Sequence, residues 1–239
     1  MMNLEWHAAW QAVIHHPLFG VGITLAAFQL AFAAYEKTRW VFLQPVLVSM
    51  LLVVGVLLAC GLTYQEYRPS VQMLTVLLGP ATVALAVPLF LNLRRIRELF
   101  APIMITLLVA GVFATALGMA LAYAFGADRM ILMTLAPKSV TSPIAMLVAE
   151  QIGGVVALAA VFVMITGIIG AIVGPELLRR FGVQHPAARG MALGLTAHAV
   201  GTAQALQESD ECGAFAALAM SLMGVMTAVL LPLAVALLL

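Results

Sequence analysis

A polar stretch in the middle of an apolar segment decides how this chain folds: Ala136-Pro137-Lys138-Ser139-Val140-Thr141-Ser142-Pro143. The surrounding segment, about 130–152, is apolar, yet its centre holds prolines, hydroxyls and a lysine. Proline removes a backbone donor and clashes with the preceding helical turn. Broken backbone at membrane depth is tolerated only where protein or a wet cavity surrounds it. The stretch therefore predicts a broken or re-entrant segment.

The composition places that stretch in a membrane protein. Of the 239 residues, 64% are hydrophobic and 9% are charged, and the formal net charge is +1. A soluble domain carries about 25% charged residues, so this chain has too little charge to coat a soluble globule of its size. The small net charge excludes a nucleic-acid footprint. We predict an all-α, polytopic helical membrane protein with a single domain over 1–239.

Six apolar runs are long enough to cross a hydrocarbon core, which takes about 20 residues. They lie at about 17–35, 42–63, 71–93, 101–126, 153–178 and 212–239. A further segment, about 191–208, has a polar middle like that of 130–152, and both are predicted to be broken or re-entrant. The predicted structural breaks are Gly79, Pro80, Pro88, Pro137, Pro143 and Gly201.

The basic residues predict the orientation, because cytoplasmic loops carry an excess of Lys and Arg. One side of the membrane would hold most of them: Lys37, Arg39, Arg94, Arg95, Arg97, Arg179, Arg180 and Arg189. The other side would hold Arg68 and Arg129. This assignment requires 130–152 to enter and leave on the same face, and it makes 191–208 a hairpin rather than a span.

An internal repeat relates the two broken segments. Alignment of 139–145 with 199–205 matches Val140 with Val200 and Ser142 with Thr202. After a three-residue shift, the glycines, alanines and prolines of the following helices also match: Gly167 with Gly224, Ala171 with Ala228, and Pro175 with Pro232. A duplication would give inverted units, because one full span lies between them. Chance matching is the alternative in a chain so rich in Ala, Val and Gly.

Lys138 is the sharpest functional signal. A charged side chain at the centre of a membrane helix costs at least about 2.5–3.5 kcal/mol, so it usually faces a cavity or a partner. Ser139, Thr141 and Ser142 add hydroxyl donors, and a helix beginning near Pro143 would direct its positive end to the same place. This arrangement suits a carboxylate. The alternative is that Lys138 snorkels to the interface.

His198 lies among small residues that let backbones approach one another. Its unperturbed pKa of about 6.5 makes both charge states accessible, so His198 and Glu150 are candidates for proton coupling. The alternative is a neutral histidine that is hydrogen-bonded to a neighbouring helix. The candidate substrate-binding residues are Lys138, Ser139, Thr141, Ser142, His198, Thr202, Gln204 and Thr82.

No catalytic residue, cofactor or metal site is predicted. The sequence offers no Ser/His/Asp or Cys/His constellation suited to hydrolysis, and no second His or Cys lies at ligand spacing from His198. Cys60 and Cys212 alone form neither a disulfide framework nor a Cys-rich metal site. Binding or transport is therefore favoured over catalysis.

Four blocks of sequence carry a family resemblance: Leu78-Gly79-Pro80-Ala81-Thr82 with the residues to 89, Ala136-Pro137-Lys138-Ser139-Val140-Thr141-Ser142-Pro143 with those to 146, Gly167-Ile168-Ile169-Gly170-Ala171 to Gly174-Pro175, and Ala188-Arg189-Gly190 through Ala197-His198-Ala199-Val200-Gly201-Thr202-Ala203. In these blocks the chain resembles the LrgB/CidB family of bacterial membrane proteins. Members are called antiholin-like, and a plant relative is the plastidal glycolate/glycerate translocator. The chain departs from the family pattern at Gln204, where Arg or Lys is usual, and at Cys212, where Glu is usual.

The resemblance implies one of two functions. The first is transport of small monocarboxylates such as glycolate, glycerate, lactate or pyruvate, alongside a small holin-like partner of the LrgA/CidA type. The second is regulation of murein hydrolase export and cell lysis. Lys138, the hydroxyl cluster and the broken helices favour transport, because they are costly in a protein that only scaffolds. We therefore predict a carboxylate transporter of the bacterial cytoplasmic (inner) membrane, and its small size is compatible with a homodimer.

Overall fold

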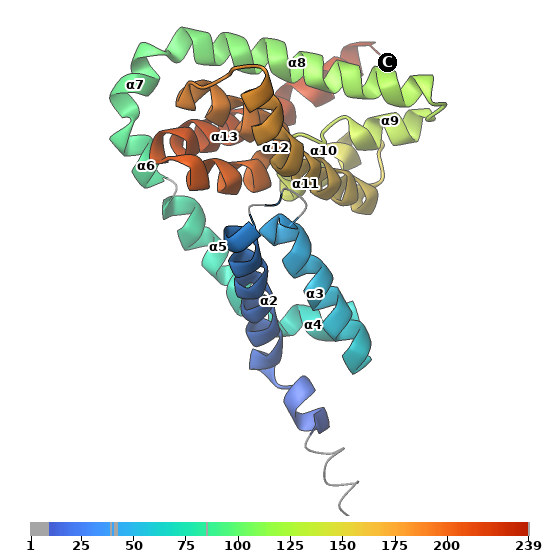
Figure 1. Cartoon of the computed structure of the whole chain (residues 1–239). Coiled ribbons are helices and arrows are strands. Elements are labelled where there is room, and N and C mark those ends of the chain that lie inside the picture. Colours follow the sequence, from blue (N-terminus) through green and yellow to red (C-terminus); the bar gives the residue numbers. More distant parts are fainter. Residues whose placement is uncertain (1–9, 39, 41–42, 85, 239) are drawn as a thin grey trace, which may run out of the picture. The chain divides into compact units, whose positions relative to one another are not determined.

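The computed structural model describes residues 10–38, 40, 43–84 and 86–238, and the long regular elements in these ranges are helices (Figure 1). The chain divides into two compact units, Met1–Ala84 and Leu85–Leu239. Four described helices are long and apolar enough to cross a membrane: Pro17–Thr38, Phe100–Ala124, Val156–Arg180 and Asp210–Leu237. These helices confirm the predicted class of polytopic helical membrane protein.

The first unit contains α2 (Pro17–Thr38), α3 (Pro45–Cys60), α4 (Tyr64–Ser70) and α5 (Gln72–Ala84). The chain bends by 116° between α3 and α4. The α2 helix contacts α4 through a hydrogen bond of 2.6 Å between the Thr24 and Tyr67 hydroxyls. The predicted span at 42–63 is therefore a shorter helix followed by a bend.

The predicted third span, 71–93, is wrong as a single span, because it consists of α5, α6 (Ala86–Leu91) and the beginning of α7 (Leu93–Glu98). The helix α5 continues through Gly79 and Pro80. Pro88 lies in the first turn of α6, where backbone N–H groups lack a helical acceptor and proline is tolerated. The predicted breaks at Gly79, Pro80 and Pro88 are therefore wrong. Residue 85, between α5 and α6, lies outside the described residues, and a turn at Asn92 separates α6 from α7.

The second unit continues with α8 (Phe100–Ala124), α9 (Arg129–Leu135), α10 (Ser142–Gln151), α11 (Val156–Arg180), α12 (Pro186–Glu208) and α13 (Asp210–Leu238). The predicted spans at 101–126, 153–178 and 212–239 correspond to α8, α11 and α13, which are long and apolar enough to cross a membrane. The remaining helices α9, α10 and α12 form the two segments that were predicted to be broken.

The α12 element folds back on itself as a helical hairpin, called hairpin 2 here (186–208). Its two arms meet at His198, whose φ of 42° and ψ of −126° are not helical. Arg189 Nε lies 2.7 Å from Glu208 Oε2. In a straight helix two residues separated by 19 positions would lie roughly 28 Å apart. The Arg189–Glu208 ion pair therefore brings the two ends of the hairpin together.

Glycines allow the backbones in hairpin 2 to approach closely. A Cβ on Gly201 would collide with the carbonyl oxygen of Leu193 in the other arm, and a Cβ on Gly194 would collide with that of Ala216 in α13. Gly201 is thus a close-packing residue within the second arm. The predicted break at Gly201 is wrong, and the chain turns at His198 instead.

Hairpin 1 (129–151) consists of α9, a turn at 136–141, and α10. The Thr134 hydroxyl accepts a hydrogen bond of 2.8 Å from the Val155 N–H, which follows α10. Met133 and Val148 share a buried apolar cluster. These contacts bring α9 alongside α10, so the segment enters and leaves on one face. Of the predicted breaks in this segment, Pro137 lies in the turn and Pro143 lies in the first turn of α10.

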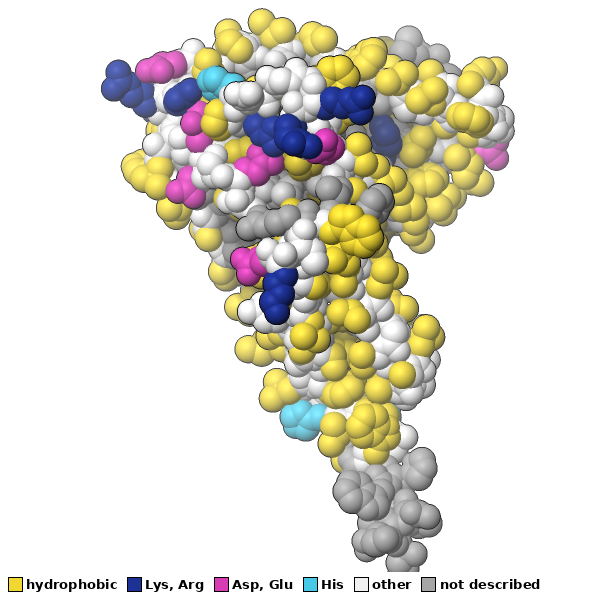
Figure 2. Space-filling view, viewed as in Figure 1, with side chains coloured by type: hydrophobic (Ala, Val, Ile, Leu, Met, Phe, Trp, Pro, Cys, Tyr) yellow, Lys and Arg dark blue, Asp and Glu magenta, His cyan; other side chains and the backbone are white. Residues whose placement is uncertain are grey.

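The two hairpins enter the second unit from opposite faces. On one face, called the Arg95 face, Arg95 lies 2.9 Å from Glu211 and 3.0 Å from Nε2 of His185, beside the ends of hairpin 2. The opposite Arg129 face holds the end of α8 and the ends of hairpin 1. Figure 2 shows Lys, Arg, Asp and Glu side chains gathered over one part of this unit, with hydrophobic side chains over most of the rest.

Contacts between the hairpins and the spanning helices match the repeat found in the sequence. A Cβ on Gly167 of α11 would lie 2.7 Å from His198 Nε2 in hairpin 2. A Cβ on Gly224 of α13, which the repeat aligns with Gly167, would lie 2.8 Å from Ile144 Cδ1 in hairpin 1. Each spanning helix thus uses an aligned glycine to pack against the hairpin of the other repeat. This reciprocity supports an inverted duplication over chance matching.

Gly194→Ala is expected to destabilise the second unit, because the added methyl collides with the Ala216 backbone. Overpacking of this kind costs about 1–3 kcal/mol, so the melting temperature in detergent should fall by several degrees. Gly55→Ala is the control, because no atom lies within 4 Å of its added Cβ, and it should melt no lower than the native protein, since alanine is the better helix former. Equal melting of the two variants would contradict the close packing of α12 on α13.

Side-specific labelling tests the opposed hairpins. In a chain whose native cysteines are replaced, thiols introduced by Gln184→Cys and Gln207→Cys, at exposed positions beside the ends of hairpin 2, should react with an impermeant maleimide from the cytoplasmic side. Thiols introduced by Phe125→Cys and Gln151→Cys should react only from the other side. Labelling at Gln184 and Gln207 from different sides would show that α12 crosses the membrane.

Candidate functional site

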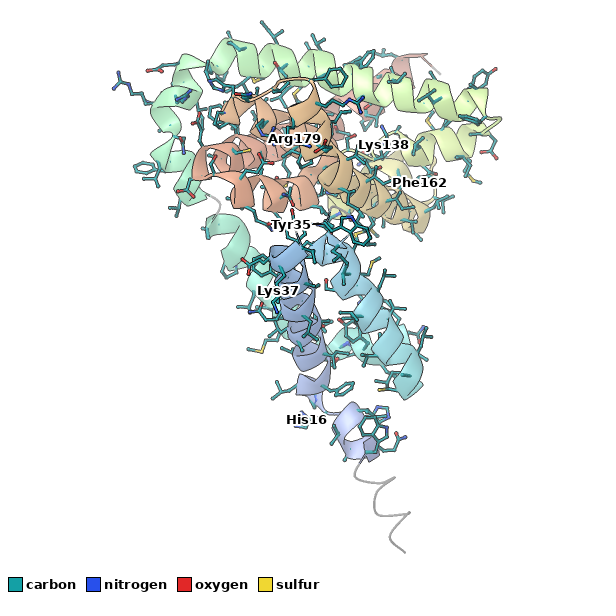
Figure 3. All side chains as sticks on the ribbon, in the orientation of Figure 1. His16, Tyr35, Lys37, Lys138, Phe162 and Arg179 are labelled. Atoms are coloured by element: carbon teal, nitrogen blue, oxygen red, sulfur yellow. The ribbon has the colours of Figure 1, made fainter. Side chains whose placement is uncertain are left out.

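The tips of the two hairpins carry the two ionisable residues that the sequence singled out. Lys138 lies in the turn of hairpin 1, and His198 is the residue at which hairpin 2 reverses. The repeat that aligns Val140 with Val200 also aligns Lys138 with His198. Figure 3 labels Lys138 among the helices of the second unit.

Lys138 reaches the middle of a spanning helix. Its Nζ donates a hydrogen bond of 3.0 Å to the Ala114 carbonyl of α8. Among the described residues, no acidic side chain forms an ion pair with it. The interpretation that Lys138 snorkels to the interface is therefore not the one seen here. Burial of an ammonium costs free energy, and pairing with an anion would offset that cost.

The hydroxyl residues surround the beginning of α10. Ser139 is buried, while Thr141 and Ser142 are half-buried. Thr141 is the N-cap residue of α10 but makes no side-chain capping hydrogen bond. The first N–H groups of a helix have no partner inside that helix, and the helix dipole makes this end positive. The beginning of α10 therefore adds attraction for an anion beside Lys138.

His198 is buried and is hydrogen-bonded to a neighbouring helix, which is the alternative to a role in proton coupling. Its Nε2 lies 2.9 Å from the Val163 carbonyl oxygen of α11. Because a carbonyl only accepts, Nε2 carries a proton and donates it. Thr202 donates its own hydroxyl to the His198 carbonyl at 2.8 Å, and Gln204 is also buried in the second arm.

Two of the predicted residues lie away from the hairpin tips. Glu150 is exposed near the end of α10, so the structure does not bring it together with His198. Thr82 belongs to α5 in the other unit, and its side chain is outside the described residues. The departure at Cys212 lies beside the ends of hairpin 2, where its Sγ is 3.8 Å from a Glu208 carboxylate oxygen.

Residues next to each tip belong to the large buried cluster of the second unit. Val140, next to the hydroxyl residues of hairpin 1, and Val163, which accepts from His198, both belong to it. By contrast, a cavity of about 400 Å³ between α8, α9 and α13 is lined almost entirely by apolar side chains. That cavity is a poor environment for a carboxylate, whereas the tips offer donors.

Four residues of this site were not found from the sequence, namely Ala114, Gly118, Val163 and Gly167. Ala114 and Val163 act through backbone carbonyls, which any residue type supplies, so their side chains carry no signal. Gly118 and Gly167 lie where a Cβ would meet Lys138 or His198. In a chain with 19 glycines, only their spacing from the accepting carbonyls sets these two apart.

The long apolar helices define a helical membrane protein, and its second unit carries two helical hairpins. The model of the LrgB-like family matches residues 24–237, so the chain belongs to the LrgB-like family.

Relatives of similar length support this assignment. The chain is 35% identical over 213 residues to YxaC of Bacillus subtilis (strain 168), covering 89% of this chain and 93% of that protein. It is 30% identical over 217 residues to the antiholin-like protein LrgB of Bacillus mycoides (strain KBAB4), covering 90% and 94% respectively. No solved structure matches the chain.

The backbone at His198 should favour glycine over alanine. A positive φ of this size is adopted readily by glycine and costs other residues about 1–2 kcal/mol. His198→Gly is therefore expected to be more stable than His198→Ala by about 1 kcal/mol in detergent unfolding. Ala203→Gly, in an ordinary helical position of the same hairpin, should lose about 1 kcal/mol relative to the native chain. Greater stability of His198→Ala would show that the turn lies elsewhere.

Proposed function

We propose that this protein transports small monocarboxylates of the glycolate, glycerate, lactate or pyruvate class across the cytoplasmic membrane. The observation that carries the proposal is Lys138, an ammonium inside the second unit that donates to a backbone carbonyl and has no acidic partner among the described residues. A substrate carboxylate would provide the missing negative charge.

The beginnings of two half-helices support an anionic substrate. The α10 helix and the second arm of hairpin 2 (199–208) both begin at a hairpin tip. The positive ends of both helix dipoles are therefore directed into the protein interior, where water screens them least. Half-helices of this kind bind anionic substrate groups in transporters built from inverted repeats.

The opposed hairpins support transport over simple binding. A carrier must expose one site to each side of the membrane in turn, and inverted repeats supply two related elements for this purpose. Here hairpin 1 lies between its own tip and the Arg129 face, and hairpin 2 lies between its own tip and the Arg95 face. The residues at the hairpin tips would bind the substrate and catalyse no reaction.

A second candidate function is antiholin-like regulation of murein hydrolase export and lysis, together with a small holin-like partner. It is favoured by the printed name of the relative that is 30% identical, antiholin-like protein LrgB. A regulator that acts through packing surfaces alone does not need an intramembrane ammonium or two half-helix beginnings. Transport therefore accounts for more of this structure.

Uptake of labelled pyruvate, lactate and glycolate into proteoliposomes tests the proposal. Lys138→Met keeps much of the side-chain stem but removes the charge. Hydrogen bonds to charged groups contribute about 1.5–3 kcal/mol, so uptake at limiting substrate should fall roughly 10- to 100-fold. Lys37→Met, at an exposed position at the end of α2, is the matched control and should transport normally.

The native chain is reconstituted both alone and with a small holin-like protein. Absence of uptake in both preparations, with correctly folded protein, would favour the regulatory function. Uptake that is equal in Lys138→Met and the native chain would keep the transport function but reject Lys138 as the carboxylate site.

A further inference from the structure

The two hairpin tips are held by contacts of the same geometry. Lys138 Nζ donates to the Ala114 carbonyl at 3.0 Å, and His198 Nε2 donates to the Val163 carbonyl at 2.9 Å. In each case the donor is the ionisable residue at a tip, and the acceptor is a backbone carbonyl in a spanning helix. The two side chains differ in chemistry, but the repeat aligns them.

A glycine follows each accepting carbonyl by one helical turn. Gly118 follows Ala114 in α8, and Gly167 follows Val163 in α11. A Cβ on Gly118 would lie 2.6 Å from Lys138 Nζ, and one on Gly167 would lie 2.7 Å from His198 Nε2. Both distances are too short for atoms that are not bonded, so either side chain would displace the donor.

The spacing has a simple physical cause. In an α-helix the carbonyl of one residue accepts from the N–H of the residue four positions later. A side chain on that later residue would crowd the carbonyl, whereas glycine leaves room for a second donor. The combination of an accepting carbonyl and a glycine one turn later therefore makes a docking point for a hairpin tip, and this unit has two of them.

We propose that these docking points keep the two hairpins closed, and that Gly118 and Gly167 are the positioning residues that make them. The Lys138 contact closes hairpin 1 against the Arg129 face, and the His198 contact closes hairpin 2 against the Arg95 face. Release of one tip opens the interior to that face alone. As an account of alternating access the inference rests on the proposed transport function, but the docking contacts can be tested without any substrate.

The chemistry of the donors explains how binding and release would be linked. A buried donor that loses its acceptor costs free energy, so a tip leaves its carbonyl readily only if another acceptor replaces it. A carboxylate is a stronger acceptor than a neutral carbonyl for an ammonium. A carboxylate substrate at Lys138 therefore competes with the Ala114 carbonyl and loosens hairpin 1.

The test measures thiol labelling from each side of sealed, oriented vesicles. Cys60 and Cys212 are replaced, and a single thiol is introduced by Ser139→Cys for hairpin 1 or by Thr202→Cys for hairpin 2, both at buried positions. Gly118→Ala should raise the labelling rate of the Ser139→Cys thiol at least roughly tenfold, from the Arg129 face only, as expected for the loss of a charge-assisted hydrogen bond. Gly167→Ala should do the same for the Thr202→Cys thiol from the Arg95 face.

The same substitution elsewhere on each helix is the matched control. A Cβ on Gly111 of α8 would approach the Met223 thioether, and one on Gly174 of α11 would approach a methyl of Leu193, each at 2.8 Å. These neighbours are the ends of flexible side chains, which can move aside. Gly111→Ala and Gly174→Ala should leave both labelling rates within about twofold of the native rates, since neither displaces the hydrogen-bond donor of a tip.

A double-mutant comparison separates positioning from general loosening. Gly118→Ala should add no labelling in a Lys138→Ala background, because the displaced side chain is already absent. An additive effect, labelling from both faces, or equal effects of Gly118→Ala and Gly111→Ala would overturn the inference. Side-specific labelling in a protein without uptake would uphold the docking points and reject the transport function, so the two proposals fail separately.

Discussion

Hydrocarbon offers no hydrogen-bond partner, so every backbone N–H and C=O at membrane depth must be satisfied by the protein itself. The backbone groups at the two chain reversals of the second unit must also be satisfied in this way. Hairpin 2 meets it partly at its reversal, where the Thr202 hydroxyl donates to the His198 carbonyl. Hairpin 1 meets it partly with side chains, since the Thr134 hydroxyl accepts the N–H of Val155.

The two hairpins are related but are not equally fixed. Hairpin 2 is joined at its ends by the Arg189–Glu208 pair and packs on α13 through Gly190 and Gly194. The repeat aligns these glycines with Met130 and Thr134 of hairpin 1, whose side chains prevent an equally close approach of backbones. Hairpin 2 therefore packs on its neighbour through close backbone contacts, and hairpin 1 packs through side chains.

Much of this fold could be predicted from the sequence. The low charge, the apolar runs and the polar segment around Lys138 gave the membrane class, three spanning helices of the second unit and the hairpin at 130–152. Proline was a poorer guide, because α5 runs through Pro80. The sequence predicted the break of hairpin 2 at Gly201, but the chain turns at His198. Gly201 instead allows close contact between the two arms. The acceptors of the two tips are backbone carbonyls, and no residue type marks them.

The opposite entry of the two hairpins has a consequence for biogenesis. With the Arg95 face in the cytoplasm, both ends of hairpin 2 stay on the side of synthesis, and the charges of Arg189 and Glu208 never cross the bilayer. Hairpin 1 starts and ends on the far side, so Asp128 and Arg129 are carried across by α8 before the hairpin can fold inward. Lys138 can then reach Ala114 only once α8 is in place. In this orientation, the hydrogen bond between Lys138 and Ala114 would join two elements that reach the far side of the membrane one after the other.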